Sequence, residues 1–498
     1  MPETTLRALN RQDFDFWAAH HLLSRAGFGG TPDQVLSLSR LGLDDAVDFI
    51  VDYQSLPEPE VSAGFQSDIM RPPTREESMA YQQARRSGDE EALSEFRRRR
   101  QERQAADRKQ VEEMRKWWLE RMIETPRPLE EKMTLFWHGH FATGYRAIED
   151  SWHMYMQNRM FRTEATGNFG RLLYGIIRDP AMLRYLNNNQ NRKQRPNENL
   201  SRELMELFSL GEGNEYTESD IKEGARALTG YTYEDDEFRY NERNHDQDQK
   251  TILGRTGNFD GDDLVGIILS RRVCSDFIAM KLYKFFVNDE PSVPNKEQRT
   301  FITAMGRRLR THEYDLKPLL KALFKSEHFY APENRCSVVK SPIQLMVQTI
   351  RSLRTPVRDL STLSAAGDLM GQSILEPPSV KGWDGGRSWI NTSTLFVRQN
   401  LAVYLLTGKR PDIYDWQVSG VRYDGDHMLS TLERDERGRV SPQEALPYLC
   451  RFLLGSEPHP SRLETLNAFL DRHGGRIDGD RLVGALCLIT SMPEYQLC

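Results

Sequence analysis

Two histidines and one carboxylate within residues 136–210 are the groups best suited to chemistry in this sequence. His138 and His140 occur in FWHGHF, and Glu203 follows in SRELMELFSL. Two imidazoles and a carboxylate form a ligand set that suits zinc or non-haem iron and leaves positions open for substrate. Such a metal could activate water for hydrolysis or bind dioxygen for oxidation. These residues therefore predict a metal-dependent enzyme of the hydrolase or oxygenase type.

The spacing of the two histidines sets a condition on this site. Side chains two positions apart on an uninterrupted α-helix point about 200° apart. His138 and His140 can therefore share a metal only if the helix that begins near Pro128 ends at Gly139. Glycine permits such an ending. We expect the chain to leave the helix there.

The helix that carries Glu203 also supplies the other predicted catalytic groups. Leucines and Phe208 form its apolar face, and Glu203 projects at the rim of that face. A carboxylate drawn partly out of water needs a cation, a metal or a proton. Helical neighbours that could join it in acid–base chemistry are Asn199, Arg202 and Glu206. Arg202 could equally be a purely structural partner, and both interpretations stay open.

Further candidate residues complete this hypothesis. His245, in the acidic segment NHDQDQK, or Glu206 could be a fourth metal ligand. The amide-rich run and the helix start after it offer hydrogen-bond donors to a substrate: Asn187, Asn189 and Asn197. A Pro/Gly-rich loop before the next helix offers aromatic and polar contacts: Trp383, Arg387, Trp389 and Asn391. The tryptophans could instead fix that loop to the core.

A second class of function explains the same residues without catalysis. In a helical binding protein or scaffold, the His, Asn, Glu and Arg side chains would form a buried polar network that fixes the register of the helices. Such networks require complete hydrogen bonding and also select specific residues. A nucleophilic hydrolase is disfavoured, since the sequence contains no GxSxG motif.

Composition restricts the partners and the compartment. A net charge of −6 gives no overall attraction for nucleic acid or anionic lipid. No segment approaches the roughly twenty apolar residues that a membrane helix needs. The five cysteines are scattered and form no CxxC pair, and the first residues contain no apolar export signal. These features predict a cytoplasmic protein.

Periodicity predicts an all-α protein: a large multi-helix bundle with long irregular loops and little or no β-sheet. We expect a helical segment at 1–60, a charged helical insert at 75–125, a helical core with a polar cleft at 126–410, and a C-terminal helical segment at 411–498. Near the start, HHLLSRAGFGGTP contains three glycines and Thr31-Pro32. No GK[ST] follows, so a helix–turn–helix junction is favoured over a phosphate loop, and His20 and His21 are interpreted as packing or surface residues and not as ligands.

Several segments in order resemble the family known as domain of unknown function 1800. They include HLLSRAGFGGTP, KMTLFWHGHFAT, NENLSRELMELFSLG and PPSVKGWDGGRSWINTSTL. The resemblance implies a large helical fold without an agreed activity. It also implies a possible sulfatase-like partner protein, because many relatives are exported and occur beside such proteins. The charged segment from 75 departs from the shared motifs.

Overall fold

The computed structural model describes residues 6–58, 64–290 and 293–498, and it confirms the predicted all-α class. Helices α1–α22 account for most of these residues. Short 3₁₀ turns occur at Arg11–Asp13, Tyr53–Ser55, Asn188–Gln190, Pro332–Asn334, Gly386–Trp389, Asp426–Leu429 and Pro493–Gln496. None of the helices in the described ranges has the length and apolar character to cross a membrane.

The helices divide into four consecutive groups along the chain. The first two groups are α1 (Phe16–Ala26) and α2 (Pro32–Val51), then α3 (Arg75–Ser87) and α4 (Glu90–Glu124). The middle of the chain contains α5 (Pro128–His140), α6 (Tyr145–Ile148), α7 (Ser151–Thr163), α8 (Phe169–Ile176), α9 (Pro180–Tyr185), α10 (Asn199–Glu206), α11 (Glu218–Ala227), α12 (Gly261–Leu269), α13 (Arg272–Phe286), α14 (Lys296–Thr311), α15 (Leu316–Lys325) and α16 (Glu327–Tyr330). The last group contains α17 (Pro342–Leu353), α18 (Leu360–Leu369), α19 (Thr392–Thr407), α20 (Pro442–Leu454), α21 (Pro460–Arg472) and α22 (Gly479–Thr490).

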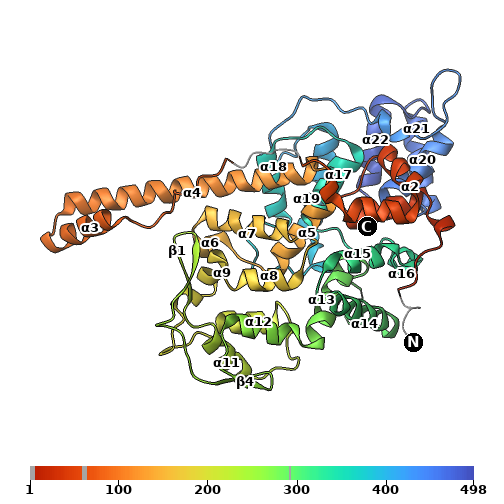
Figure 1. Cartoon of the computed structure of the whole chain (residues 1–498). Helices are drawn as coiled ribbons and strands as arrows, with labels where there is room; N and C mark the ends of the chain where they lie inside the picture. Colours follow the sequence, from red (N-terminus) through yellow and green to blue (C-terminus); the bar gives the residue numbers. More distant parts are fainter. Residues whose placement is uncertain (1–5, 59–63, 291–292) are drawn as a thin grey trace.

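Two short antiparallel hairpins are the β-structure of the described chain. β1 (Tyr231–Glu234) pairs with β2 (Glu237–Tyr240), with Tyr231 opposite Tyr240. β3 (Lys250–Ile252) pairs with β4 (Arg255–Gly257). The first hairpin lies at the edge of the helical body beside α9, and the second lies beside α11 (Figure 1). They do not change the fold class.

The charged segment predicted at 75–125 is helical and forms an arm. Figure 1 shows α4 extending far from the body, with α3 folded back along its outer part. The outer half of α4 is held by exposed ion pairs such as Arg98–Glu95 at 2.8 Å. Its inner half is buried through Met114, Trp118 and Met122. The arm is therefore continuous with the core, and the four predicted domain boundaries stay predictions.

Helix α5 lies at the centre of the fold and is buried almost all round. Pro128 begins it, because a proline at the first helical position loses no hydrogen bond. Its residues from Leu129 to His138 are all buried. It lies near α1, α2, α4 and α7, and the loop 378–391 crosses its C-terminal end. Helix α5 therefore positions the two predicted histidines. It also carries Lys132 and Phe136, which line a cavity.

Candidate functional site

The helix does not end at Gly139, so the expected convergence of the two histidines is wrong. α5 continues through Gly139 to His140. His138 Nε2 accepts a hydrogen bond from the backbone N–H of Leu375 at 3.1 Å. His140 Nε2 donates to the carbonyl oxygen of Phe208 at 3.0 Å. The two imidazoles therefore point to different neighbours and carry opposite tautomers. Burial lowers the pKa of each to about 3, so both are neutral at physiological pH.

The loop 378–391 approaches the backbone of α5 closely at Gly139. A Cβ added at Gly382 would lie 2.1 Å from the Gly139 carbonyl oxygen, so the two backbones are nearly in contact. A Cβ added at Gly139 itself would meet the Trp383 ring at 3.7 Å, an ordinary contact. The space above Gly139 thus tolerates a methyl group, and the helical backbone there needs no glycine.

We therefore expect Gly139→Ala to raise the free energy of unfolding by about 0.5–1 kcal/mol, because alanine favours a helix interior over glycine. Urea denaturation followed by circular dichroism measures this change. A destabilised variant would indicate that residue 139 leaves the helix in solution, as the sequence had suggested.

The predicted catalytic residues of α10 differ in their burial and in their interaction partners. Glu203 is partly buried, as expected at the rim, and has no hydrogen bond or ion pair among the described residues. Burial and then Glu206 raise the pKa of Glu203, while Arg202 lowers it. Arg202 itself pairs with Glu198, Glu206 and Glu218, at 3.1, 3.3 and 2.8 Å. Asn199 is exposed at the start of the helix. Their catalytic roles stay predictions.

The predicted metal ligands do not form a group. His245 Nδ1 donates to the Thr229 carbonyl oxygen at 2.8 Å and is buried beside Tyr240. Across residues 6–58, 64–290 and 293–498, no three His, Cys, Asp or Glu side chains are arranged so that they could hold a metal ion. His138, His140, Glu203 and His245 therefore do not fit zinc or iron in this arrangement. The reason is the continuous helix, which separates the two imidazoles.

The amide-rich loop is largely structural. Asn188 Nδ2 donates to the carbonyl oxygens of Leu228 and Tyr231, and Asn191 Nδ2 donates to that of Ala225 at 2.9 Å. Of the predicted substrate contacts, Asn187 is exposed with a φ of 57°, and Asn197 caps the N–H of Asn199. Asn189 Oδ1 is buried without a partner among the described residues. This loop holds α11 and β1 and does not border the large cavity described next.

A large cavity lies where α5, α10, α13 and the loop 378–391 meet. Its volume is about 820 Å³, and its apolar wall contains Phe136, Phe277, Phe285, Trp383 and Trp389. Five residues predicted from the sequence line it: His140, Glu206, Trp383, Arg387 and Trp389. Asn391 lies outside and caps α19 through Thr394. The cavity is large enough for a small organic molecule.

The charged lining of this cavity is unevenly paired. Two of its basic groups pair with acidic groups at the outer edge, Lys381 with Asp384 at 3.1 Å and Arg387 with Glu290 at 2.8 Å. Four further basic groups of the lining have no Asp or Glu partner within 4.0 Å among the described residues: Arg25, Lys132, Lys281 and Lys340. Arg25 donates to the Cys498 oxygen at 2.6 Å, Lys132 to the Gly27 carbonyl and Lys340 to the Tyr495 carbonyl. Of these four described groups, Lys281 is therefore the unsatisfied cation of this lining.

Lys281 is the least satisfied of these cations. Its ammonium lies 5.3 Å from the centre of the Phe277 ring and has no hydrogen bond or ion pair within the described residues. Burial, followed by the charges of Lys284 and Lys381, lowers its pKa. An anion bound here would relieve both the repulsion among the lysines and the missing hydrogen bonds.

Two buried acceptors in the same lining also lack donors. His140 Nδ1 and Asp289 Oδ1 have no hydrogen-bond partner among the described residues. His140 is 93% buried because only 7% of its surface is exposed, and its Nε2–H is already used by Phe208. Its Nδ1 is itself buried, so this lone pair is an unsatisfied group inside the protein and does not face the cavity. Burial raises the pKa of Asp289.

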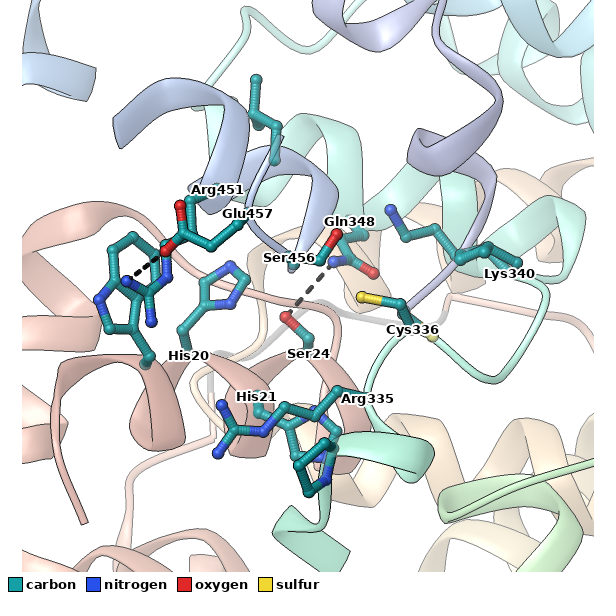
Figure 2. A pocket seen from close by; sticks show the side chains of 16 residues that line it. His20, His21, Ser24, Arg335, Cys336, Lys340, Gln348, Arg451, Ser456 and Glu457 are labelled. Carbon is teal, nitrogen blue, oxygen red and sulfur yellow. Dashed lines mark hydrogen bonds and ion pairs between the residues drawn. The ribbon is translucent and has the colours of Figure 1, made fainter. Parts of the chain in front are cut away.

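A smaller pocket of about 270 Å³ adjoins the large cavity and shares Lys340 and Cys498 with it. Figure 2 shows His20, His21 and Ser24 of α1 facing Arg335, Cys336 and Gln348. Burial lowers the pKa of His20 to about 4, and His21 Nε2 donates to the Phe329 carbonyl oxygen at 3.0 Å. Both histidines are buried, which decides for packing over a surface position, and α1 and α2 meet at the predicted junction.

The sequence contains a pattern that marks Lys132 and Lys281, which were not predicted as site residues. Lys132 precedes Phe136 by four residues, and Lys281 lies four residues from both Phe277 and Phe285. Side chains four apart share one face of a helix, so these lysines belong to apolar faces. A lysine on an apolar face is either snorkelling to solvent or facing a polar cavity. The spacing alone does not distinguish these two cases.

Comparison with known proteins places the chain in a family but gives no activity. No curated protein and no solved structure matches the sequence. One family model, described as a protein of unknown function, matches residues 21–497. This range covers nearly the whole chain, including the arm and all of the large cavity's lining except Cys498. The chain therefore belongs to the family of proteins of unknown function DUF1800.

Proposed function

We propose that this protein binds a small organic anion in the large cavity between α5, α10, α13 and the loop 378–391. The observation that carries the proposal is Lys281, a cation that lines the cavity beside other basic groups and has no hydrogen bond or ion pair among the described residues. The aromatic rings of the lining would cover the carbon skeleton of the ligand, and charged side chains such as Lys281 would hold its carboxylate or phosphate.

The histidine that borders the cavity does not suit acid–base chemistry. His140 Nδ1 is buried without a partner among the described residues. Because the pKa of His140 is lowered to about 3, its imidazole accepts a hydrogen bond and is a poor base near neutral pH. The proposed ligand is therefore a small organic anion that is held by charge and by ring contacts.

Fewer observations support the functions that were predicted from the sequence. A metal-dependent reaction lacks a fitting ligand group among the described residues, and zinc or iron stays a prediction that elemental analysis of purified protein can test. A purely structural polar network explains the contacts of Asn188 and Asn191, but it does not explain a large cavity with unsatisfied polar atoms. The cytoplasmic location and the sulfatase-like partner stay predictions.

Ligand binding can be tested with a charge-removing variant of Lys281. We expect hydroxycarboxylates or sugar phosphates to raise the melting temperature of the protein, and neutral polyols to have no effect. Lys281→Gln should weaken the binding of the best anion about tenfold to a hundredfold, the effect of losing one charge-assisted hydrogen bond. Isothermal titration calorimetry measures this change.

The matched control is Lys222→Gln, which removes the same charge from an exposed position on α11 outside the cavity. It should bind the anion with unchanged affinity. Equal weakening in both variants would attribute binding to the overall charge, and the proposal would then be wrong.

A further inference from the structure

Lys132 is an almost completely buried lysine in the lining of the large cavity. It extends from the buried helix α5, and only 5% of its surface is exposed. Its Nζ donates to the Gly27 carbonyl oxygen at 2.9 Å and to Oε1 of Gln344. The rings of Phe28 and Phe285 lie 5.4 and 5.6 Å away. The amine is thus fixed by two acceptors and enclosed by two aromatic rings.

This geometry leaves one direction of the nitrogen unused. A tetrahedral amine has four directions, of which one is its own carbon and two point to Gly27 and Gln344. The remaining direction holds either a third hydrogen or, in the neutral form, a lone pair. Lys132 belongs to the lining of the cavity, so this fourth direction is where a bound molecule would have to approach.

The surroundings favour the neutral form. Burial lowers the pKa of Lys132 to about 7. The charges that face it are those of Arg25 and Lys340, which lower the pKa further, and Cys498, which raises it. No Asp or Glu side chain pairs with the amine among the described residues. At neutral pH the neutral fraction of such an amine is on the order of a thousandfold above that of an ordinary exposed lysine.

We propose that Lys132 is a nucleophile that condenses with an aldehyde or ketone carbonyl of the anion bound in the large cavity. This inference rests on the proposed anion binding and narrows its ligands to carbonyl-bearing organic anions, such as 2-oxo acids and phosphorylated aldehydes or ketones. Desolvated lysines beside other cations are suited to imine formation, because the amine is deprotonated while the iminium product carries the charge.

The condensation balances without any oxidant, reductant or metal. The nitrogen lone pair attacks the carbonyl carbon, a C–N bond forms, and the C=O π electrons move to oxygen. A proton passes from nitrogen to that oxygen, and a second proton from solvent allows it to leave as water. The product is an iminium ion that retains one N–H, so one of the two original acceptors is released. Gln344, as a side chain, can turn away.

The test is reductive trapping with glyoxylate, the smallest aldehyde that carries a carboxylate. The unmodified full-length protein is incubated with glyoxylate and sodium cyanoborohydride, digested, and analysed by peptide mass spectrometry. We expect Lys132 to be labelled first, with a rate that rises through about pH 7, following its lowered pKa. Exposed lysines such as Lys222 give the reference labelling rate in the same digest.

Two variants control for the other amines of the cavity. Lys132→Arg keeps a charged donor but removes the nucleophile, and it should abolish the early label. Lys340→Arg changes a second buried lysine, whose pKa burial lowers to about 8, and should leave the label on residue 132. Because the site of labelling is mapped in the unmodified chain, the result does not depend on whether either variant folds.

Glycolate separates this inference from the proposed function. It carries the same carboxylate but no carbonyl. If glycolate stabilises the protein through Lys281 while Lys132 stays unlabelled by glyoxylate, anion binding holds and the nucleophile is refuted. If neither anion binds and Lys132 reacts no faster than exposed lysines, both proposals are overturned.

Discussion

Replacing Glu131 by glutamine is expected to lower the free energy of unfolding by about 3–5 kcal/mol, because it breaks a buried ion pair. Glu131 is fully buried on α5 and accepts hydrogen bonds from Trp118 Nε1 at 2.9 Å, from Arg162 Nε at 2.7 Å, and from Arg121. Glutamine preserves the shape but leaves Arg162 without an acidic partner within the described residues. Urea denaturation of the purified variant measures the loss.

A matched substitution on the arm separates burial from the mere loss of a carboxylate. Glu95 contacts Arg98 and Arg99 at 2.8 Å each, in the same kind of pairing, but its side chain is exposed. Exposed ion pairs contribute little, so Glu95→Gln should leave the unfolding midpoint unchanged. Equal destabilisation by the two substitutions would contradict the assigned role of the Glu131 cluster.

The same cluster predicts how stability responds to acid. Burial raises the pKa of Glu131, but the charges and hydrogen bonds of Arg162 and Arg121 lower it further, so the net pKa lies below the ordinary 4.5. Its stabilisation is therefore complete above the unfolded-state pKa and is lost as pH falls through the folded-state pKa. Glu131→Gln should show a weaker loss of stability below pH 4.5 than the unmodified protein.

The fold was predictable from the sequence because its signals are local. Helical periodicity, the proline at the start of α5 and the threonine caps of α2, α3 and α11 each depend on residues within one or two turns. The rim position of Glu203 followed from the same periodicity. These features persist whatever the helix packs against.

The site was only partly predictable because it depends on contacts between distant segments. Gly139 could either end a helix or admit a neighbouring backbone, and only the position of Gly382 decides between them. The HxH spacing is equally compatible with two packing histidines. The cavity lining combines Lys132 and Lys281, which are about 150 positions apart in sequence. No pattern within either helix shows that they line one cavity.

The contact between Gly382 and Gly139 predicts the second large effect. Gly382 has a φ of 81°, in the left-handed region, and an added Cβ would overlap the Gly139 carbonyl oxygen at 2.1 Å. Alanine at 382 would cost about 1–2 kcal/mol for the backbone conformation and roughly another 1–3 kcal/mol for overpacking. The loop would shift away from α5, and Trp383 with it. We therefore expect Gly382→Ala both to destabilise the protein and to weaken anion binding.

Gly385→Ala isolates the steric part of this prediction. Gly385 has a similar φ of 76° and also lines the cavity, but nothing lies within 4 Å of an added Cβ. It should lose only the conformational contribution, about 1–2 kcal/mol, and retain its affinity for the anion. Denaturation and calorimetry on the two variants provide the comparison. If both variants lose the same stability and the same affinity, the seating of the loop on the α5 backbone does not shape the cavity.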